Sequence, residues 1–398
     1  MPNFEKLDAL LQKFAAETVP GCACAVAQDG KILYEGYYGY ADYEKKIPVK
    51  AENIYRQASM TKLVTYTILM KLMEEGKVSM DQPLSDFFPA WADKTKFVRD
   101  ADGSLREEPL SRPITVRDAT IMSCGMPYCF GPAPESATNP TLLAMSRAME
   151  PVWAKGHYNV QDAIAALAPV PVGFDPGTHW QYGFGSEIIG GVVEKITGMR
   201  LYQAMRHYIF EPLGMTETDT LFTDTLTEDL LVRGYRVTED GFAVMPREFD
   251  RSQYPGEENE DGKPSLMTNV RDFTKMLQMW ACGGEYNGTR IMKEETLAFM
   301  RVNQLSETAL HEYQTENSGY NAGYGYGYGV RTLMDKEKCP GAACGNIGAF
   351  GWTGGFGTWC EADPVSRISI VYMHNMMPNQ ELYHHHAVRE AAYLAFAE

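Results

Sequence analysis

The chain has 398 residues, of which 44% are hydrophobic and 22% are charged, and its formal net charge is −16. This composition is typical of a globular protein of two or three structural units, and no stretch approaches the roughly 20 apolar residues of a membrane-spanning helix. Because phosphate backbones and anionic lipids bind clustered Lys and Arg, the acidic balance argues against nucleic acid or a membrane as partner.

The start of the chain predicts a cytoplasmic protein. Residues 1–7 have neither the basic start nor the apolar run of a secretory signal. The eight cysteines are scattered and form no CxxC pair, so neither a zinc site nor a disulfide framework is indicated. We expect reduced, mostly buried thiols.

The N-terminal segment predicts a helix followed by a β-hairpin. Asn3 can cap a helix over residues 3–17, where apolar residues recur at three- and four-residue spacing. Residues 22–27 and 32–40 are predicted strands, because the Asp29-Gly30 pair between them is a strong hairpin signal. A sheet is therefore expected to begin early in the chain.

The middle of the chain, about residues 80–300, is predicted to be mainly helical. It follows a helix expected over residues 60–75, which is apolar on nearly every face and is followed by Gly76, where helices commonly stop. Residues 81–113 are expected to form a loop, without the character of a linker between independent domains. The clearest later helices are predicted at residues 161–168, 186–197 and 270–280.

Strand signals return near the C-terminus. The predicted strands are residues 326–333, 357–362 and 368–374, and a helical tail is predicted over residues 385–397. The Gly-Tyr alternation of residues 323–329 favours a strand at the sheet edge. Both chain ends thus contribute to one α/β domain, residues 1–58 and 300–398, into which a mainly helical domain, residues 59–299, is inserted. We expect the active site at their interface.

The segment Ser59-Met60-Thr61-Lys62 is the first candidate for chemistry. It stands where a polar lead-in gives way to the most apolar helix, so Ser59 is expected at a helix N-terminus. The three-residue offset puts the two side chains about one turn apart on one helix face, within reach of each other. Such a spacing arises easily by chance, but a lysine inside an apolar helix is costly unless it has a partner or a function.

Two further segments contain candidate residues. Tyr182 lies just before the helix predicted at residue 186, although most tyrosines serve only packing. The Gly-rich run from Trp352 to Gly355 leads into a strand, and its glycines would let the backbone approach a ligand. The run His384-His385-His386 cannot converge on one metal ion, because consecutive helix residues point in different directions. We expect it at the surface or, through one member, along a cleft.

These residues resemble the penicillin-recognising serine hydrolases: the class C β-lactamases, the family VIII carboxylesterases and the D-Ala-D-Ala peptidases. Ser59 to Lys62 is similar to the SxxK motif of that group, Tyr182-Gly183-Phe184 to its Tyr-x-Asn motif, and Trp352-Thr353-Gly354 to its Lys/His/Trp-x-Gly motif. Similar segments also occur at residues 75–83, 114–125 and 210–215, and the resemblance spans about residues 20–395.

The resemblance implies a fold and a set of roles. The fold would be β-lactamase/transpeptidase-like, an antiparallel sheet flanked by the N- and C-terminal helices with a helical insert. Ser59 would attack a carbonyl, while Lys62 and Tyr182 share the base and acid roles. The backbone N–H groups of Ser59 and Gly355 would form the oxyanion hole, in which each donor typically contributes about 2.7–4 kcal/mol. No metal and no cofactor is needed.

Two departures from the motifs bear on the substrate. Phe184 replaces an Asn that resembles a ligand for a lactam amide side chain, and Trp352 replaces a Lys that would pair with a substrate carboxylate. With Thr353 and Gly354 they would line a pocket for a small ester, amide or lactam. Both changes favour esterase-like hydrolysis of uncharged substrates. The alternatives are a β-lactamase or D-amino-acid peptidase, and a catalytically idle binding or sensor protein of the same fold.

Overall fold

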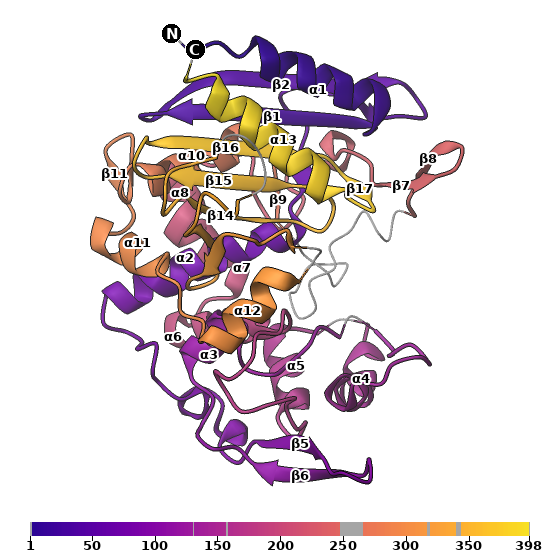
Figure 1. The fold of residues 1–398 in the computed structure, drawn as a ribbon, viewed down its shortest axis with the longest axis vertical. Coiled ribbons are helices and arrows are strands. Elements are labelled where there is room, and N and C mark those ends of the chain that lie inside the picture. Colours follow the sequence, from indigo (N-terminus) through magenta and orange to yellow (C-terminus); the bar gives the residue numbers. More distant parts are fainter. Residues whose placement is uncertain are drawn as a thin grey trace.

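One large sheet organises the molecule. The computed structural model describes residues 2–129, 131–156, 158–246, 266–316, 319–339 and 344–397. Within these residues the sheet has eight strands in the order β12-β13-β14-β15-β16-β1-β2-β3, and each neighbouring pair is antiparallel (Figure 1). The strands are β1 (Gly21–Gln28), β2 (Lys31–Asp42), β3 (Ile47–Pro48), β12 (Tyr324–Tyr326), β13 (Arg331–Leu333), β14 (Phe350–Thr353), β15 (Trp359–Asp363) and β16 (Ile368–Met373).

Both chain ends build this sheet, as the sequence predicts. β1 lies between β2 and β16, and Ala25 of β1 pairs with Val371 of β16. The β1–β2 hairpin turns at Asp29 and Gly30, whose φ angles of 50° and 78° are both positive, as the hairpin turn favoured by Asp-Gly requires. The predicted α/β fold with an antiparallel sheet is therefore confirmed.

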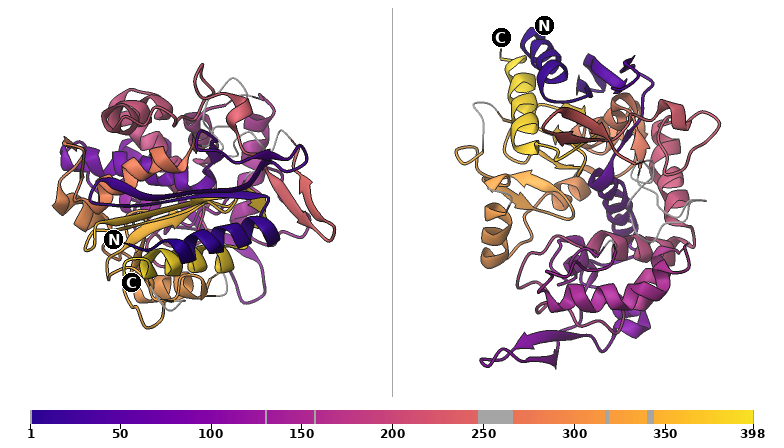
Figure 2. Two further views of the ribbon diagram at one scale, coloured as in Figure 1. Left: turned by 90° about the horizontal axis from the view of Figure 1, so that it is seen from above. Right: turned by 90° about the vertical axis from the view of Figure 1, so that its right-hand side faces the viewer.

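Helices cover both faces of the sheet. They are α1 (Glu5–Glu17), α10 (Val270–Ala281) and α13 (Glu381–Leu394). Cys24 of β1 faces a hydrophobic layer beneath α1 and α13, whereas its neighbours Ala23 and Ala25 face the main core, to which α10 belongs. Seen edge-on, the sheet lies between the two terminal helices and the bulk of the molecule (Figure 2).

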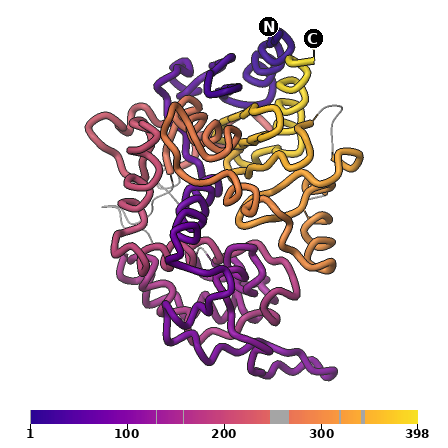
Figure 3. Tube along the Cα trace, turned by 90° about the vertical axis from the view of Figure 1, so that its left-hand side faces the viewer, coloured from indigo at the N-terminus to yellow at the C-terminus, as the bar shows by residue number. Residues whose placement is uncertain are grey.

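The central helix is α2 (Thr61–Glu74), and 11 of its 14 residues are buried. It contacts α6 (Gly185–Thr197) and α11 (Glu294–Met300). Figure 3 shows it running between the part of the chain that carries the sheet and the mainly helical part. Gly76, with φ 72°, follows its last turn, so the predicted helix over residues 60–75 is confirmed.

The predicted helices of the middle segment are also present. The other helices are α3 (Val116–Thr120), α4 (Pro140–Trp153), α5 (Val160–Leu167), α7 (Leu201–Met205), α8 (Glu211–Leu213) and α12 (Glu307–Thr315). Small sheets are formed by β4 (Tyr55–Arg56), β5 (Thr95–Arg99), β6 (Leu105–Pro109), β7 (Tyr235–Thr238), β8 (Gly241–Val244), β9 (Met267–Thr268), β10 (Glu285–Tyr286), β11 (Thr289–Arg290) and β17 (Met376–Met377).

Three expectations about local structure were wrong. Residues 81–113 are not all loop, because β5 and β6 form a hairpin. Neither strand has a buried face, so the sequence shows no apolar alternation there. The strand expected over residues 326–333 is interrupted by a turn, and β12 and β13 lie on either side of it. The C-terminal helix begins at Glu381 rather than at residue 385. The Gly-Tyr segment does supply the edge strand, β12.

Helix α10, which lies within residues 59–299, packs against β1, β15 and β16 of the large sheet. The division into residues 1–58 with 300–398 and residues 59–299 remains a prediction. Six of the eight cysteines are buried, as expected. Among the described ranges, no helix is both long enough and apolar enough to span a membrane.

Replacing Gly329 by alanine is expected to destabilise the fold strongly. Gly329 has φ 77°, and a Cβ at this position would overlap the buried ring of Tyr66. Gly76→Ala is a matched control, because Gly76 has φ 72° and its Cβ would meet no atom within 4 Å. The control should lose roughly 1–2 kcal/mol through backbone strain alone, and Gly329→Ala about 1–3 kcal/mol more through the clash. Chemical denaturation measures both, and equal losses would contradict the prediction.

Candidate active site

Ser59 lies at the entrance to the central helix, as predicted. It is half-buried in a short 3₁₀ turn, Ala58–Met60, that continues directly into α2. Ala58 has φ 45°, a left-handed conformation that is unfavourable for a residue other than glycine. Such strain persists only where the surroundings impose it, and it often accompanies functional sites.

Lys62 is buried beside Ser59. Its side chain lies in the first turn of α2, the residue is 2% exposed, and its Nζ is 3.1 Å from Ser59 Oγ. The same Nζ lies 5.2 Å from the ring centroid of Tyr182 and 5.3 Å from that of Tyr128, a distance at which a cation is attracted to an aromatic face. The structure thus brings together the serine and lysine of the SxxK segment and the predicted tyrosine.

Trp352 contacts the phenol of Tyr182. Its indole Nε1–H donates to Tyr182 Oη over 3.1 Å, and the two ring centroids are 5.6 Å apart. Because an indole nitrogen can only donate, the phenol oxygen is the acceptor. Trp352 is 6% exposed, so its indole is mostly covered by neighbouring side chains.

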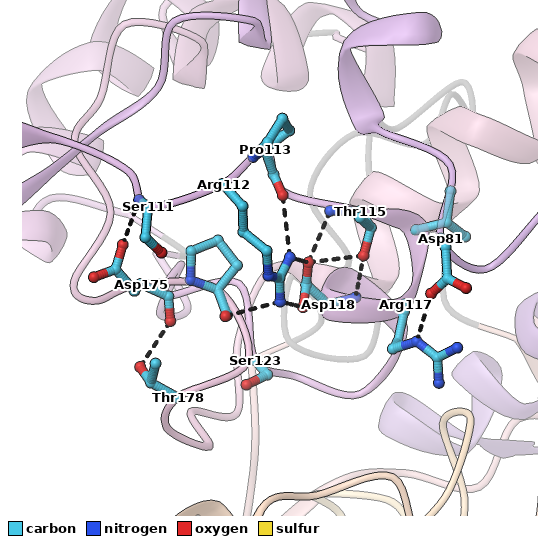
Figure 4. A network of polar contacts seen from close by, with 12 residues as sticks. Asp81, Ser111, Arg112, Pro113, Thr115, Arg117, Asp118, Ser123, Asp175 and Thr178 are labelled. Carbon is cyan, nitrogen blue, oxygen red and sulfur yellow. Dashed lines mark hydrogen bonds and ion pairs between the residues drawn. The ribbon is translucent and has the colours of Figure 1, made fainter.

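A network of polar contacts fixes the loop that carries Tyr182 (Figure 4). Asp175 accepts a hydrogen bond from Ser111 N at 2.8 Å, and Arg112 donates to Pro176 O over 2.8 Å. Arg112 also forms a two-pronged ion pair with the buried Asp118, at 2.6 and 2.8 Å. Residues 111–118, which overlap the similar segment at residues 114–125, therefore hold the start of the loop that carries Tyr182.

Gly354 brings the third motif against the first. A Cβ at Gly354 would overlap Gln57 O, so only glycine allows this approach. Thr358 Oγ1 donates to the same Gln57 oxygen over 3.1 Å. Gly355 follows in the turn between β14 and β15 and is exposed, and a Cβ there would meet no atom within 4 Å. The turn is thus tied to the backbone two residues before Ser59.

Thr353 and Phe184 occupy different surroundings. Thr353 is half-buried, and its Oγ1 donates to Glu381 Oε2 over 3.1 Å. Burial raises the pKa of Glu381, and the bond from Thr353 opposes that shift. Phe184 is 1% exposed and belongs to the hydrophobic core. Its predicted contact with a substrate is not supported by an exposed ring face and remains a prediction.

The histidine run corrects an expectation. His384 and His385 are 0% and 1% exposed, so neither lies at the surface. His385 Nε2 is 3.1 Å from Gly357 O, and its Nδ1 is 2.9 Å from the Tyr320 hydroxyl. A carbonyl can only accept, so Nε2 carries the proton and donates to Gly357 O, and burial lowers the pKa of His385 well below 6.5. The side chain of His385 therefore supports the turn that contains Gly355.

No group of three potential metal ligands occurs in the described part of the chain.

Sequence reasoning missed two residues of this site. Tyr128 reaches the site because residues 126–127 pair with Gly183, where any Cβ would overlap Met126 O; its ring centroid is 5.3 Å from that of Tyr182. Glu187 is buried in the first turn of α6 and accepts a 2.7 Å hydrogen bond from Ser186 Oγ. Burial raises the pKa of Glu187, while the positive charge of Lys62 opposes this shift. Neither contact has a signal in local spacing.

Comparison with known proteins identifies the family. A family model described as Beta-lactamase matches residues 7–394. The chain belongs to the β-lactamase family. The Rv1367c protein of Mycobacterium tuberculosis is 27% identical over 92% of this chain and 88% of its own length. Esterase EstB of Burkholderia gladioli is 28% identical over 53% of this chain and 50% of its own.

The fold of this β-lactamase-family chain also agrees with solved structures. That of EstCE1, described as a hydrolase with promiscuous acyltransferase activity, has a TM-score of 0.76 and 22% identity and covers 98% of both chains. The predicted membership of the penicillin-recognising group is confirmed. The protein is a serine hydrolase of this family, with esterases and acyltransferases among its relatives.

Replacing Glu187 by glutamine is expected to remove a pH-dependent loss of the free energy of unfolding. Because burial raises the pKa of Glu187 above its usual 4.5, the folded protein disfavours the ionised form. The wild type should therefore lose free energy of unfolding relative to Glu187→Gln as the pH rises from about 4.5 through the raised pKa. Denaturation of both proteins from pH 4 to pH 8 measures this difference. Glu239→Gln, at an exposed turn, is the control, and a pH-independent difference for Glu187→Gln would contradict the prediction.

Proposed function

We propose that this protein hydrolyses small uncharged esters or amides through an acyl-enzyme on Ser59. The observation that carries the proposal is the 3.1 Å contact between Ser59 Oγ and the buried Lys62 Nζ, beneath the ring of Tyr182. A hydroxyl is a weak nucleophile near neutral pH, and an adjacent base together with a helix N-terminus activates it.

In the proposed reaction the side chains move one proton back and forth. As Ser59 Oγ bonds to the carbonyl carbon, its proton passes to the Lys62–Tyr182 pair. The pair returns that proton to the leaving alcohol or amine as its bond to the carbonyl carbon breaks. A water molecule then attacks the acyl-enzyme in the same way, releasing the acid and restoring Ser59. The N–H groups of Ser59 and Gly355 would stabilise the oxyanion in both steps.

The preference for uncharged substrates is supported by Trp352. A lysine at this position would offer a positive charge to an anionic substrate, whereas the indole donates its only N–H to Tyr182. Thr353, whose hydroxyl faces the carboxyl of Glu381, offers no cation either. An anionic penicillin would therefore lose a charge-assisted partner at this motif.

The location and the partners follow from the same picture. Eight scattered cysteines without a CxxC pair, six of them buried, suit a reducing compartment, so we retain the cytoplasm as the proposed location. The proposed partner is a small-molecule ester, amide or lactam, without nucleic acid or membrane.

Ser59→Ala is expected to abolish turnover while leaving the fold intact, because the half-buried hydroxyl is lost without a new clash. Hydrolysis of a short-chain nitrophenyl ester and covalent labelling by a fluorophosphonate measure the loss, and circular dichroism checks the fold. If the wild type were not labelled at Ser59, the catalytically idle alternative would replace this proposal.

Tyr182→Phe is expected to lower kcat by about 10²- to 10⁴-fold, the usual contribution of a general acid-base group. Tyr128→Phe is the matched control, because Tyr128 faces the same lysine, whereas the indole of Trp352 donates its only N–H to Tyr182. Steady-state kinetics of both variants test the assignment. Undiminished turnover in Tyr182→Phe, or equal losses in the two variants, would refute it.

The substrate class is tested with matched compounds on the purified protein. We expect faster hydrolysis of a nitrophenyl butyrate than of a chromogenic cephalosporin, whose carboxylate finds no cation at residue 352. The reverse order would favour the β-lactamase alternative. Faster release of D-alanine from a D-Ala-D-Ala peptide would favour the peptidase alternative.

A further inference from the structure

We propose that Glu312 is a positioning residue that holds the Tyr182 loop in its reactive geometry. This inference rests on the proposed function, because it assigns Glu312 a role through Tyr182. Glu312 lies on α12, a helix outside all three motifs, and contacts the tyrosine loop from there. The claim concerns the orientation of the phenol and assigns no contact between Glu312 and a substrate.

The two carboxylate oxygens of Glu312 engage two consecutive residues of the loop. Oε1 lies 2.7 Å from His179 Nδ1, and Oε2 accepts a hydrogen bond from the backbone N–H of Trp180 at 2.9 Å. Burial raises the pKa of Glu312, but the Trp180 and His179 contacts outweigh it and lower the pKa overall. The group is therefore an ionised acceptor with both oxygens in use.

The Trp180 ring transmits this restraint to Tyr182. The two rings are stacked, with centroids 6.0 Å apart and an interplanar angle of 21°. The Trp180 ring also packs edge-on against Tyr313 and Tyr326, with ring centroids 5.0 and 5.9 Å away. Since Tyr313 follows Glu312 on α12, one helix turn holds both the backbone and the ring of Trp180. The contacts shown in Figure 4 fix the same loop earlier, at Asp175.

The contacts of Glu312 with His179 and Trp180 border an open pocket. An open pocket of about 540 Å³ is lined by Tyr182 together with Phe174, His179, Trp180, Glu312 and Glu316. The side chains of His179 and Glu312 are 46% and 37% exposed. Contacts between groups this exposed contribute little to global stability, commonly about 0–1 kcal/mol. Their removal should therefore disturb the loop more than the fold, which separates positioning from a general structural role.

The test compares Glu312→Ala with Glu312→Gln. Alanine removes both acceptors, so kcat should fall by about 10- to 100-fold, the scale of a loss of alignment of about 1 Å. Because substrate binding does not depend on the phenol, KM should stay within about twofold of the wild type. Fluorophosphonate labelling of Ser59 should slow by a similar factor as kcat. Glutamine keeps one acceptor oxygen, so it should recover part of the loss.

Glu316→Gln is the matched control, because Glu316 lines the same pocket and accepts neither the His179 nor the Trp180 contact. It should keep the kcat of the wild type. Unchanged kcat in Glu312→Ala, or an equal fall in Glu316→Gln, would overturn the inference. If Glu312→Ala does not fold, the loss in Glu312→Gln alone decides. If Ser59→Ala is inactive while Glu312→Ala is fully active, only the positioning role of Glu312 is wrong. An active Ser59→Ala would refute the proposed function itself.

Discussion

The site depends on an amine held inside the protein. Transfer of an isolated ammonium from water into a protein interior costs several kcal/mol unless partners compensate. Lys62 has such partners: the hydroxyl of Ser59, the faces of two tyrosine rings, and the nearby carboxyl group of Glu187. The rest of α2 is almost wholly buried, so the helix cannot turn this residue towards solvent without exposing its apolar side chains. The position of the amine is thereby fixed before any substrate arrives.

Glycine contacts between distant segments assemble the surroundings of that amine. Gly183 lies against Met126, which brings Tyr128 and Tyr182 together, and Gly354 lies against Gln57, which brings the third motif to Ser59. At both places a side chain would overlap a carbonyl oxygen, so the backbones approach more closely than any other residue allows. Four parts of the chain that are far apart in sequence are therefore joined in pairs by backbone packing. As a result Tyr128 and Tyr182 both face Lys62, and Trp352 contacts Tyr182.

Contacts set by local spacing could be predicted from the sequence, whereas contacts made by the packing of distant segments could not. Ser59 and Lys62 are one helical turn apart, so their contact follows from helix geometry alone, and the Asp29-Gly30 turn follows from backbone preference. Tyr182 was found among many tyrosines only through a resemblance to known motifs. Tyr128 and Glu187 gave no signal, because tertiary packing alone brings them to the lysine. The histidines of α13 were expected near the surface because they are polar. The sequence does not show the partners whose hydrogen bonds compensate for the burial of His385.

The strand order delays the completion of the sheet while the chain is being synthesised. β1 needs β16 as its neighbour, yet about 340 residues separate their paired positions. At synthesis rates of about 5–20 residues per second, the first hairpin waits roughly 20–70 seconds for the strand that covers its open edge. During that interval β1 presents unpaired backbone groups and the apolar side chains of Cys24 and Val26, features that invite association with other chains. Protection by a ribosome-bound chaperone would matter most for this N-terminal hairpin.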